Sequence, residues 1–495
     1  MEDTPRESGV EVLFINSYRD TILSYSVRFL SKPRMHLHRG REVWRSRALR
    51  TLVSGLTLLV ACVLLASFAS AQDWVKTGTN LGIEKPRLAV ADFKPSSTNP
   101  QNTALLKTFN DTLWNDLDVS GIVELVSKSF YPLQVPGQPP EVNFLAWNAP
   151  PPNAGMLAFG NLGINPAGRL TVQGWLYDVK NTASPLILGK QYADDAPSDA
   201  AARVMAHKFA DEIIFRLGGG IPGIAESHIY FVSDRSGHKE IWAMDYDGAN
   251  QHQITHLGTI SLSPRVSPDG SRVAFSSLTK AGWEIMMYSL DLNRMVSFPR
   301  FGGGTNLSPA WSGDGLKLAF SSSRSGAPEI FVADASGANA KRLTDSKGPD
   351  VSPVWNRKTN AQLAFVSGRS GLPQIYTMEI DGTNQQNITD QGYAVSPSWS
   401  PNGQFLTFAW VRKYGPGDPG ASDIYLMDIA SKKWVQLTHD GGRNDFPSWS
   451  PDGRHIVFQS NRTGTIEIWS MLANGSHPQQ LTFTGHNSQP NWSWK

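Results

Sequence analysis

The chain has 495 residues, of which 40% are hydrophobic, and it carries 45 Lys and Arg against 43 Asp and Glu. This length exceeds that of one ordinary domain, so two or three domains are expected. The hydrophobic content excludes a disordered chain, and the 44 glycines and 32 prolines favour a turn-rich β protein.

The first 71 residues have the order of a secretory signal peptide. Arg39–Arg50 is basic, Thr51–Phe68 is apolar, and Ala69-Ser-Ala71 precedes Gln72. This order predicts cleavage after Ala71 and an exported protein. Two alternatives stay open, namely a nucleic-acid-binding arm in the basic run and a retained membrane anchor in the apolar run.

Two residues of this segment leave further questions open. Met35 offers a second start codon behind an unusually long amino-terminal extension. Cys62 is the only cysteine, and Leu59-Val-Ala-Cys62 imitates a lipoprotein cleavage site, although the apolar run continues beyond it. The exported chain then has no cysteine, so its stability must come from its core without disulfides.

The exported part of the chain is nearly neutral. Residues 1–71 hold 10 of the Lys and Arg and 6 of the Asp and Glu, which leaves 35 basic against 37 acidic residues and a net charge of −2. Such a protein lacks the positive charge that drives binding to phosphate backbones. We therefore expect no nucleic-acid partner.

A small α/β domain is predicted over residues 72–220. Its expected elements are a strand at Arg87–Phe93, a helix at Ala104–Leu117, a strand at Ile122–Val126, a short helix at Val142–Trp147, strands at Met156–Phe159, Leu170–Val179 and Leu186–Tyr192, and a helix at Asp199–Leu217. The last helix presents an apolar face of Val204, Phe209, Ile213, Ile214 and Leu217.

This domain shows no pattern of a chemical site. Gly218–Gly220 follow a helix, which is the wrong end for binding an anion. Asp194, Asp195 and Asp199 cluster near a helix start, where capping explains carboxylates better than a metal does.

Residues 225–495 contain six copies of one pattern, which reads Ser-Pro-x-Trp-Ser-Pro-Asp-Gly in its fullest form. The first prolines of the copies stand at positions 264, 309, 353, 397, 447 and 490, so the steps are 45, 44, 44, 50 and 43 residues. Two alternating strands and a short third strand come between successive copies. Four strands in a repeat of this length indicate a propeller blade.

The number of strands predicts that the ring closes. Six three-strand units begin near Ile229, Val273, Leu318, Leu363, Phe405 and Ile456. The first unit lacks a preceding Pro-x-Trp strand, and the last such strand, Pro490–Trp494, lacks a following unit. Pairing the two removes an exposed sheet edge. The predicted fold is thus an α/β domain followed by an all-β six-bladed propeller closed by the C-terminal strand.

The repeated motifs have structural explanations. Ser-Pro-Asp-Gly, as at Ser267–Gly270, predicts a tight turn, and so does Asp245–Asn250. Calcium binding is the alternative for these turns, but the spacing of a calcium loop is missing. One repeat position holds Trp311, Trp355, Trp399, Trp449 and Trp492, with Val266 in the first copy. We expect these tryptophans to be wedges between blades, with sugar stacking as the alternative.

Patterns of catalysis are missing. The sequence has no Gly-x-Ser-x-Gly and no His-Glu-x-x-His, and the histidines of the propeller are scattered. We therefore expect no catalytic residue, no metal, no cofactor and no small-molecule substrate. Recognition is expected instead on the face that gathers the longer inter-blade connections, which are Arg300–Leu307, Asp345–Val351, Asp390–Val395, His439–Asp445 and Thr482–Ser488.

From about Ile83 to Lys495 the chain resembles the TolB family of periplasmic proteins of the Tol-Pal system. The motifs that carry the resemblance are Ala210-Asp-Glu-Ile213, Ile229-Tyr-Phe-Val-Ser-Asp-Arg235, Glu240–Asn250 and the Ser-Pro-x-Trp-Ser-Pro-Asp-Gly repeats, behind a signal peptide and an α/β domain. The long amino extension, the enlarged loop Arg412–Ser422 and the apolar Phe301 depart from the family's pattern.

The resemblance implies a monomeric, non-enzymatic periplasmic adaptor. Its propeller would bind the peptidoglycan-associated lipoprotein Pal, and its amino-terminal tail, about Gln72–Lys85, would contact the inner-membrane protein TolA. Such a link maintains outer-membrane integrity and constriction during cell division. Mapped onto this chain, the Pal-binding residues would be Phe301, Gly304, Asn306, Asp350, Tyr393, Asn444, Asp445 and His486. Two alternatives remain: a secreted hydrolase or lyase that works through the central channel, and a propeller scaffold with another partner.

Overall fold

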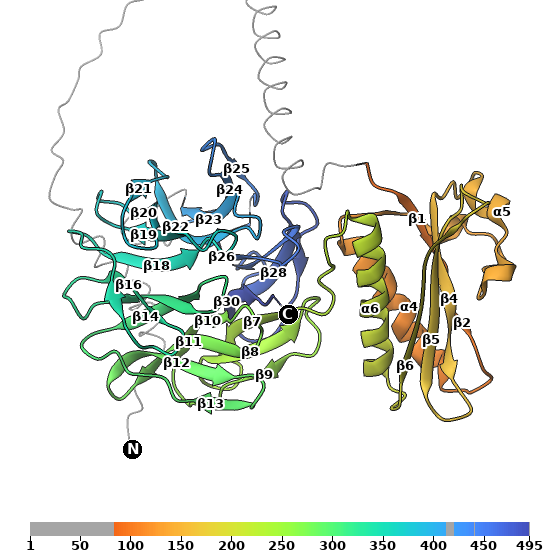
Figure 1. Cartoon of the computed structure of the whole chain (residues 1–495), viewed down its shortest axis with the longest axis horizontal. Coiled ribbons are helices and arrows are strands. Elements are labelled where there is room, and N and C mark those ends of the chain that lie inside the picture. Colours follow the sequence, from red (N-terminus) through yellow and green to blue (C-terminus); the bar gives the residue numbers. More distant parts are fainter. Residues whose placement is uncertain (1–83, 412–419, 440, 495) are drawn as a thin grey trace, which may run out of the picture.

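A computed structural model describes residues 84–411, 420–439 and 441–494. The chain forms an α/β domain beside a six-bladed propeller (Figure 1). The predicted cleavage site after Ala71, Cys62 and nearly all of the tail Gln72–Lys85 lie outside the described residues. Within the described part, no helix is long and apolar enough to cross a membrane.

The α/β domain is built on one mixed sheet. Its strands are β1 (Arg87–Val90), β2 (Lys94–Pro95), β3 (Glu124–Leu125), β4 (Met156–Ile164), β5 (Leu170–Asp178) and β6 (Leu186–Asp194). The order is β3-β1-β4-β5-β6, with β2 also paired to β4. β1 runs parallel to β3 and β4, whereas β5 runs antiparallel to both β4 and β6.

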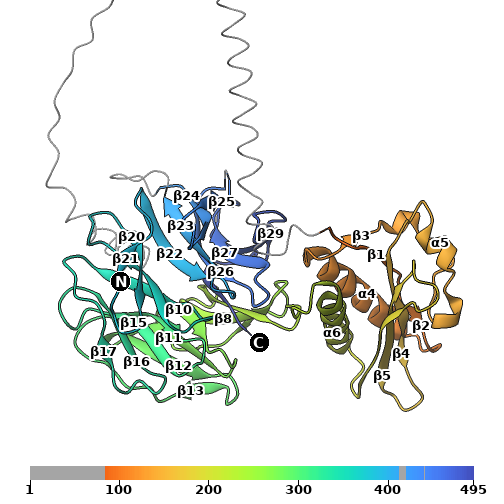
Figure 2. The same cartoon turned by 45° about the horizontal axis from the view of Figure 1, so that its top comes forward.

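Two long helices lie between this sheet and the propeller (Figures 1 and 2). They are α4 (Asn102–Val119) and α6 (Asp199–Leu217). α6 begins after Ser198, whose hydroxyl accepts a hydrogen bond from the Ala201 amide at 3.1 Å. None of the predicted carboxylates forms this cap; of the three, Asp199 lies in the first turn of the helix, where the dipole favours a negative charge.

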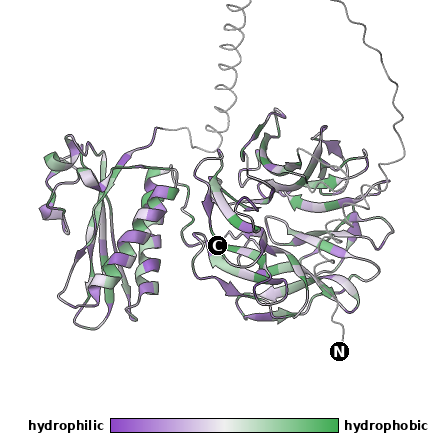
Figure 3. Cartoon of the chain, turned by 180° about the vertical axis from the view of Figure 1, so that it is seen from behind, coloured by the Kyte–Doolittle hydropathy of each residue, from purple (hydrophilic) through white to green (hydrophobic). Residues whose placement is uncertain are grey.

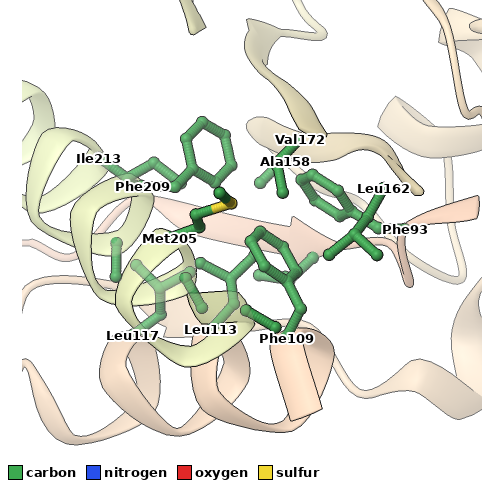
Figure 4. Packing of buried hydrophobic residues seen from close by; sticks show 14 of the residues in the cluster. Phe93, Phe109, Leu113, Leu117, Ala158, Leu162, Val172, Met205, Phe209 and Ile213 are labelled. Atoms are coloured by element: carbon green, nitrogen blue, oxygen red, sulfur yellow. The ribbon is translucent and has the colours of Figure 1, made fainter. Parts of the chain in front are cut away.

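The core of the domain lies between the helices and the sheet. Leu113 of α4 meets Met205 and Phe209 of α6, and all three side chains are buried (Figure 4). The predicted apolar face of α6 was wrong for Val204, which is 45% exposed. Met205 and Phe209 point toward the core, so Val204, one residue away and about 100° around the helix, faces outward.

The opposite face of the sheet is covered by irregular chain. This cover includes two 3₁₀ helices, at Lys128–Phe130 and Pro139–Glu141, and α5 (Phe144–Asn148). Trp147 of α5 is buried against the same cluster as Phe159 and Tyr177. α5 begins after Asn143, whose side chain accepts a hydrogen bond from the Ala146 amide.

The propeller has six blades of four antiparallel strands each. Blade 1 consists of β30 (Asn487–Trp492), β7 (His228–Ser233), β8 (Glu240–Asp245) and β9 (His252–Gln253), and blade 2 consists of β10 (Ser261–Val266), β11 (Arg272–Thr279), β12 (Gly282–Ser289) and β13 (Arg294–Val296). Blade 3 consists of β14 (Asn306–Trp311), β15 (Lys317–Ser322), β16 (Glu329–Asp334) and β17 (Lys341–Arg342), and blade 4 consists of β18 (Asp350–Trp355), β19 (Gln362–Ser367), β20 (Gln374–Glu379) and β21 (Gln386–Asn387). Blade 5 consists of β22 (Tyr393–Trp399), β23 (Phe405–Val411), β24 (Ser422–Asp428) and β25 (Trp434–Gln436), and blade 6 consists of β26 (Asn444–Trp449), β27 (His455–Ser460), β28 (Glu467–Leu472) and β29 (Gln479–Gln480).

The predicted closure of the ring is confirmed. β30 pairs antiparallel with β7, and Asn487 lies opposite Ser233 while Trp492 lies opposite Ile229. The last strand of the chain is therefore the first strand of blade 1 (Figure 1). Because this pairing joins the two ends of the repeat, blade 1 leaves no unpaired strand at the seam.

The repeated tryptophans are buried between neighbouring blades, as predicted. Trp311, Trp355, Trp399, Trp449 and Trp492 are each at most 6% exposed. The indole of Trp355 donates to the Ala310 carbonyl of the preceding blade at 3.0 Å, and the indole of Trp311 donates to the Arg265 carbonyl at the same distance. Each tryptophan thus combines apolar burial with a hydrogen bond or close packing across the seam.

The residue before each repeat proline has a left-handed backbone. Its φ lies between 51° and 54° in all six copies, at Ser263, Ser308, Ser352, Ser396, Phe446 and Gln489. The register of every first strand shifts at this point, which marks a β-bulge. The bulge explains why the strand accommodates a proline that cannot donate a hydrogen bond.

Hydropathy is distributed differently in the two parts. Figure 3 shows helices with hydrophilic and hydrophobic faces in the α/β domain, while the propeller strands carry hydrophobic stretches. The buried clusters of the propeller span pairs of adjacent blades; one of them joins Trp355 and Leu363 of blade 4 to Ala319 and Ile330 of blade 3. The blades are therefore stabilised mainly by their neighbours.

Candidate partner-binding surface

The propeller has two unlike faces. The Ser-Pro-Asp-Gly turns and the turns between third and fourth strands lie on one face, which we call the turn face. The other, which we call the loop face, carries the inter-blade segments 300–307, 345–351, 390–395, 439–445 and 482–488 together with the connections between second and third strands. The predicted partner-binding residues all belong to the loop face.

Neighbouring loops of this face are tied together by hydrogen bonds. The Thr305 amide donates to the Ser323 hydroxyl at 2.9 Å, and the Arg443 amide donates to Asn461 at 2.8 Å. The His486 amide donates to the Asp234 carboxylate at 2.8 Å. These bonds position the loops on the rigid ring, which is the arrangement expected of a recognition surface.

Five of the predicted residues are at least partly accessible, namely Phe301, Gly304, Tyr393, Asp445 and His486. His486 has a side chain that is 58% exposed, and its Nδ1 lies 3.7 Å from the Asp234 carboxylate. Gly304 is exposed, and Tyr393 is half-buried at the start of β22. Phe301 is half-buried and stacks on Phe320 with 4.3 Å between ring centroids, so part of its surface stabilises blade 3.

Gly304 has a conformational reason to be glycine. Its φ is +116°, and a Cβ at this position would lie 2.6 Å from the Ser323 hydroxyl oxygen and 2.9 Å from the Ser323 carbonyl carbon. A larger residue would displace the loop from its neighbour. Gly304 therefore shapes the surface without offering a side chain to it.

Three of the predicted residues, Asn306, Asp350 and Asn444, are fully buried. The Asn444 amide nitrogen donates to Asp423 of the preceding blade at 3.2 Å, and its oxygen accepts from Arg462 at 2.9 Å. Asn306 contacts Glu284 in the same way at 3.2 Å. In each case an acidic residue at or near the start of a third strand contacts the first residue of the next blade. We call this contact the seam latch.

Asp350 occupies the latch position of blade 4, but unlike asparagine its ionised side chain has no N–H group to donate to the acid of the preceding blade. Its Oδ2 accepts a hydrogen bond from Arg369 at 2.7 Å, while its buried Oδ1 has no partner among the described residues. Burial and the nearby Glu329 carboxylate raise the pKa of Asp350. In this structure Asn306, Asp350 and Asn444 are not accessible, so any effect on a partner would be indirect.

Asp445 lies just after the latch of blade 6 and is half-buried. Its carboxylate accepts a hydrogen bond from the Phe446 amide at 2.7 Å. Burial raises the pKa of this group. Asp445 thus supports the left-handed bulge residue Phe446 at the edge of the loop face.

An arginine that was not predicted from the sequence recurs in this surface. Arg235, Arg324, Arg369 and Arg462 each follow a second strand, and each places its guanidinium over two aromatic rings. Arg462 lies 4.7 Å from the Trp469 ring centroid and also binds Asn444. The signal was present as Arg-Ser-Gly or Arg-Thr-Gly at each of these positions.

A second polar cluster was also missed, between the α/β domain and the propeller. Asp116 of α4 accepts a hydrogen bond from Tyr246 and lies 2.7 Å from Nδ1 of His207. Arg203 of α6 binds Asp247 at 2.6 Å and Asp245 at 3.3 Å. The carboxylates of the turn 245–250 are thus paired with an arginine here.

Burial raises the pKa values of two carboxyl groups at this seam between the domains. It raises the pKa of Asp116, and it raises the pKa of Asp211 to about 7. Asp211 accepts a hydrogen bond from the Ala225 amide of the linker at 3.1 Å. Across the residues that the structure describes, no group of three or more His, Cys, Asp or Glu side chains is arranged to hold a metal ion.

Comparison with known proteins supports both parts of the architecture. The family model described as "TolB beta propeller domain" matches residues 216–416 and 390–495, and that described as "TolB amino-terminal domain" matches residues 79–184. A solved structure of TolB from Acinetobacter baumannii aligns with a TM-score of 0.69 over 83% of this chain and 97% of that chain, at 22% sequence identity. This likeness confirms the fold.

Named relatives cover different shares of the chain. A "Protein TolB homolog" of Chlorobium luteolum is 30% identical over 315 residues, which are 62% of this chain and 68% of that protein. A "Tol-Pal system protein TolB" of Desulfosudis oleivorans is 36% identical over 181 residues, or 37% of this chain. The chain spans about two fifths of the length of the first curated relatives it matches, with 41% and 40% covered. With both domains matched by their family models, the chain belongs to the TolB family.

Proposed function

We propose that this protein is a periplasmic adaptor of the Tol-Pal system. Its loop face binds a peptidoglycan-associated lipoprotein of the Pal type, and its amino-terminal tail binds the inner-membrane protein TolA. The protein thereby links the two membranes and supports outer-membrane integrity and constriction during cell division. It carries out no chemical reaction.

The observation that carries this proposal is the construction of the loop face. Loops of differing sequence are held on a closed ring by hydrogen bonds such as that from the Arg443 amide to Asn461. The seam latches beneath them fix the start of each blade, as Asn444 does between Asp423 and Arg462. A preformed platform of this kind binds a partner with little ordering cost.

His486 gives the sharpest test, because it is exposed on the loop face and has a matched control, His477, nine positions earlier in the chain between β28 and β29. His477 is also exposed but belongs to the turn face. We expect His486→Ala to weaken binding of the purified Pal-type domain by about tenfold, as a contact residue near the centre of an interface would. His477→Ala should leave the affinity unchanged.

Isothermal titration calorimetry with both variants measures these affinities directly. Equal affinities for His486→Ala, His477→Ala and the unchanged protein would show that the partner does not use this part of the face. No binding to any Pal-type domain of the same host would overturn the proposal itself.

The tail is tested separately. The predicted segment Gln72–Lys85 lies almost wholly outside the described residues, so this part of the proposal rests on the family. A chain that begins at Glu84 should lose binding to the periplasmic part of TolA and keep binding to the Pal-type domain. Retained TolA binding would place that contact elsewhere on the molecule.

A further inference from the structure

Three residues depart from the repeat where the first strands of the blades meet the Ser-Pro-Asp-Gly turns. Arg265 takes a position that is Ala310, Ser398 or Ser448 in other copies. Arg357 and Trp494 both take a position that is Pro401 or Pro451 in the copies with a complete turn. All three departures replace a small or cyclic residue with a large side chain at the turn face.

These side chains converge from different blades. Arg357 follows β18 of blade 4, and its Nη2 lies 3.4 Å from the Val266 carbonyl oxygen of blade 2. Its guanidinium carbon lies 5.0 Å from the ring centroid of Trp494, which follows β30 of blade 1. Blades 1 and 4 stand opposite each other in a ring of six, so Arg357 extends across the axis of the propeller.

Among the described residues, the two arginines have no carboxylate as a counter-ion. Arg265 donates to the Pro264 carbonyl at 2.8 Å, and the buried Nη1 of Arg357 has no hydrogen-bond partner in the part of the chain that the structure describes. Within the described residues, neither guanidinium forms an ion pair. Burial lowers the pKa of both groups to about 10, and the charge of Arg265 contributes to the shift of Arg357.

This arrangement is unlike that of the other arginines in the ring. Arg369 on the loop face also lies over an aromatic ring, but it binds the Asp350 carboxylate at 2.7 Å. Partly buried charges are normally paired in this way, because an unpaired buried charge is destabilising. Arg265 and Arg357 instead lie near each other without a carboxylate between them among the described residues, and the buried Nη1 of Arg357 is a free hydrogen-bond donor there.

We propose that Arg265, Arg357 and Trp494 form an anion-binding site that takes a carboxylate group at the turn-face end of the propeller axis. Guanidinium groups bind carboxylates through paired, charge-assisted hydrogen bonds. Trp494 stacks against Arg357 and holds its guanidinium in place. The carboxylate belongs either to an acidic peptide segment that enters the channel or to a free small carboxylate.

Calorimetric titration of the purified protein at low ionic strength tests the site. The probes are the blocked peptide acetyl-Glu-Glu-Glu-Glu-amide and citrate, with the neutral acetyl-Gln-Gln-Gln-Gln-amide as the control ligand. We expect binding of at least one carboxylate probe and none of the neutral peptide. Because the attraction is between charges, the affinity should fall as salt is added.

Two substitutions remove the charges with little risk to the fold. Arg265→Ser introduces the residue found at Ser398 and Ser448, and Arg357→Gln keeps a polar side chain of similar reach. Each should weaken carboxylate binding by about tenfold or more, the usual size of one charge-assisted hydrogen bond. Arg357→Lys keeps the charge but loses the planar donors, so its affinity for the carboxylate probe should lie between those of the unchanged protein and Arg357→Gln. Arg294→Gln, at an exposed position of β13, should have no effect.

The outcomes separate the possible sources. Tighter binding of the tetraglutamate peptide than of citrate identifies a peptide segment, and the reverse identifies a small carboxylate. The proposal would be overturned if neither probe binds. It would also be overturned if Arg265→Ser and Arg357→Gln bind the probes as tightly as the unchanged protein does, with unchanged melting temperatures. Because the site lies on the turn face, these variants should bind the Pal-type domain normally, so the result is independent of the proposed function.

Discussion

The seams between blades and the seam between the two domains are built on different principles. Each blade seam places an apolar wedge such as Trp355 beside a hydrogen-bonded latch such as Asn444 with Asp423. The domain seam is richer in ionisable groups, with Asp116, His207 and Arg203 in contact across it or beside it. Apolar wedges are insensitive to pH, whereas buried carboxyl groups make a contact respond to it, at the domain seam and at the latches alike.

Both kinds of seam leave some buried polar atoms without partners among the described residues, as Oδ1 of Asp350 and Nε1 of Trp399 show for the blade seams. At the domain seam, Nε2 of His207 and Nε of Arg203 are buried without hydrogen-bond partners among the described residues. At the blade seam of Asn487, the same side chain donates to Glu467 at 2.7 Å and accepts from Arg235 at 2.9 Å. Wedge and latch recur around the closed ring, whereas the domain seam occurs once, so we expect a change of arrangement at the domain seam rather than between blades.

The largest effect is expected from removing the wedge that closes the ring. Trp492 is 1% exposed and packs with Ile229 of blade 1 and Ile468 of blade 6, and its indole donates to Ser227 at 2.7 Å. Trp492→Ala should lower the free energy of unfolding of the propeller by about 3–5 kcal/mol. Denaturant unfolding followed by circular dichroism measures the change.

Leu316→Ala is the matched control for this prediction. Leu316 is 67% exposed in the turn before β15, and its truncation should change the stability by no more than about 0.5 kcal/mol. A loss at Trp492 no larger than that at Leu316 would mean that the closing strand contributes little to the ring.

The second prediction concerns the pH response of the domain seam. The pKa of Asp211 is raised to about 7, from an ordinary value near 4 in the unfolded chain. Between these values the unfolded state releases its proton more readily, so the stability of the α/β domain falls as pH rises from about 4 to about 7 and levels off above that. The loss should be on the order of 2 kcal/mol because Asp211 is only partly buried.

Asp211→Asn should flatten this pH profile, because an amide cannot ionise and keeps an oxygen for the Ala225 amide. Thermal melts between pH 4.5 and 8 compare the variant with the unchanged protein. Asp381→Asn is the control, since Asp381 is exposed in a turn and its pKa is lowered by hydrogen bonds from Thr383. Parallel profiles for the unchanged protein and Asp211→Asn would contradict the prediction.

Much of the fold was predictable because the propeller repeats. The spacing of Pro264, Pro309 and the later prolines determined the number of blades, and the unmatched strand Pro490–Trp494 determined how the ring closes. The helix Asp199–Leu217 was predicted with its observed bounds, which capping and periodicity define locally. Only its outward Val204 was misassigned, since the burial of one side chain depends on the exact rotation of the helix.

The surface was harder to predict because its residues have two roles that look alike in sequence. Asn306, Asp350 and Asn444 stand in loops between repeats, as contact residues do, yet they are buried in seam latches. Whether a polar loop residue points outward or into a seam depends on contacts with the preceding blade, such as that of Asn306 with Glu284. The domain seam was invisible for the same reason, because Asp116 and Tyr246 are 130 positions apart in the chain.

The smallest expected effect comes from making the latch of blade 4 like the others. One carboxylate oxygen of Asp350 has no partner among the residues that the structure describes. Asp350 also lies near Glu329, whose charge is partly balanced by Arg342 at 3.0 Å. Asp350→Asn supplies an amide donor for Glu329 and keeps an oxygen for Arg369. We expect a gain of about 0.5–1 kcal/mol at pH 8.

The sign of the pH effect provides the check. Because the pKa of Asp350 is raised in the folded protein, ionisation destabilises the ring above the unfolded value near 4, and the gain from Asp350→Asn should shrink at pH 4.5. The reverse change, Asn444→Asp, places a second carboxylate beside Asp423 and should destabilise blade 6 at pH 8 by about 1–3 kcal/mol. Melts of the two variants at both pH values measure these differences. If Asp350→Asn and Asn444→Asp shift the stability in the same direction at pH 8, charge at the latch position does not govern the strength of the seam.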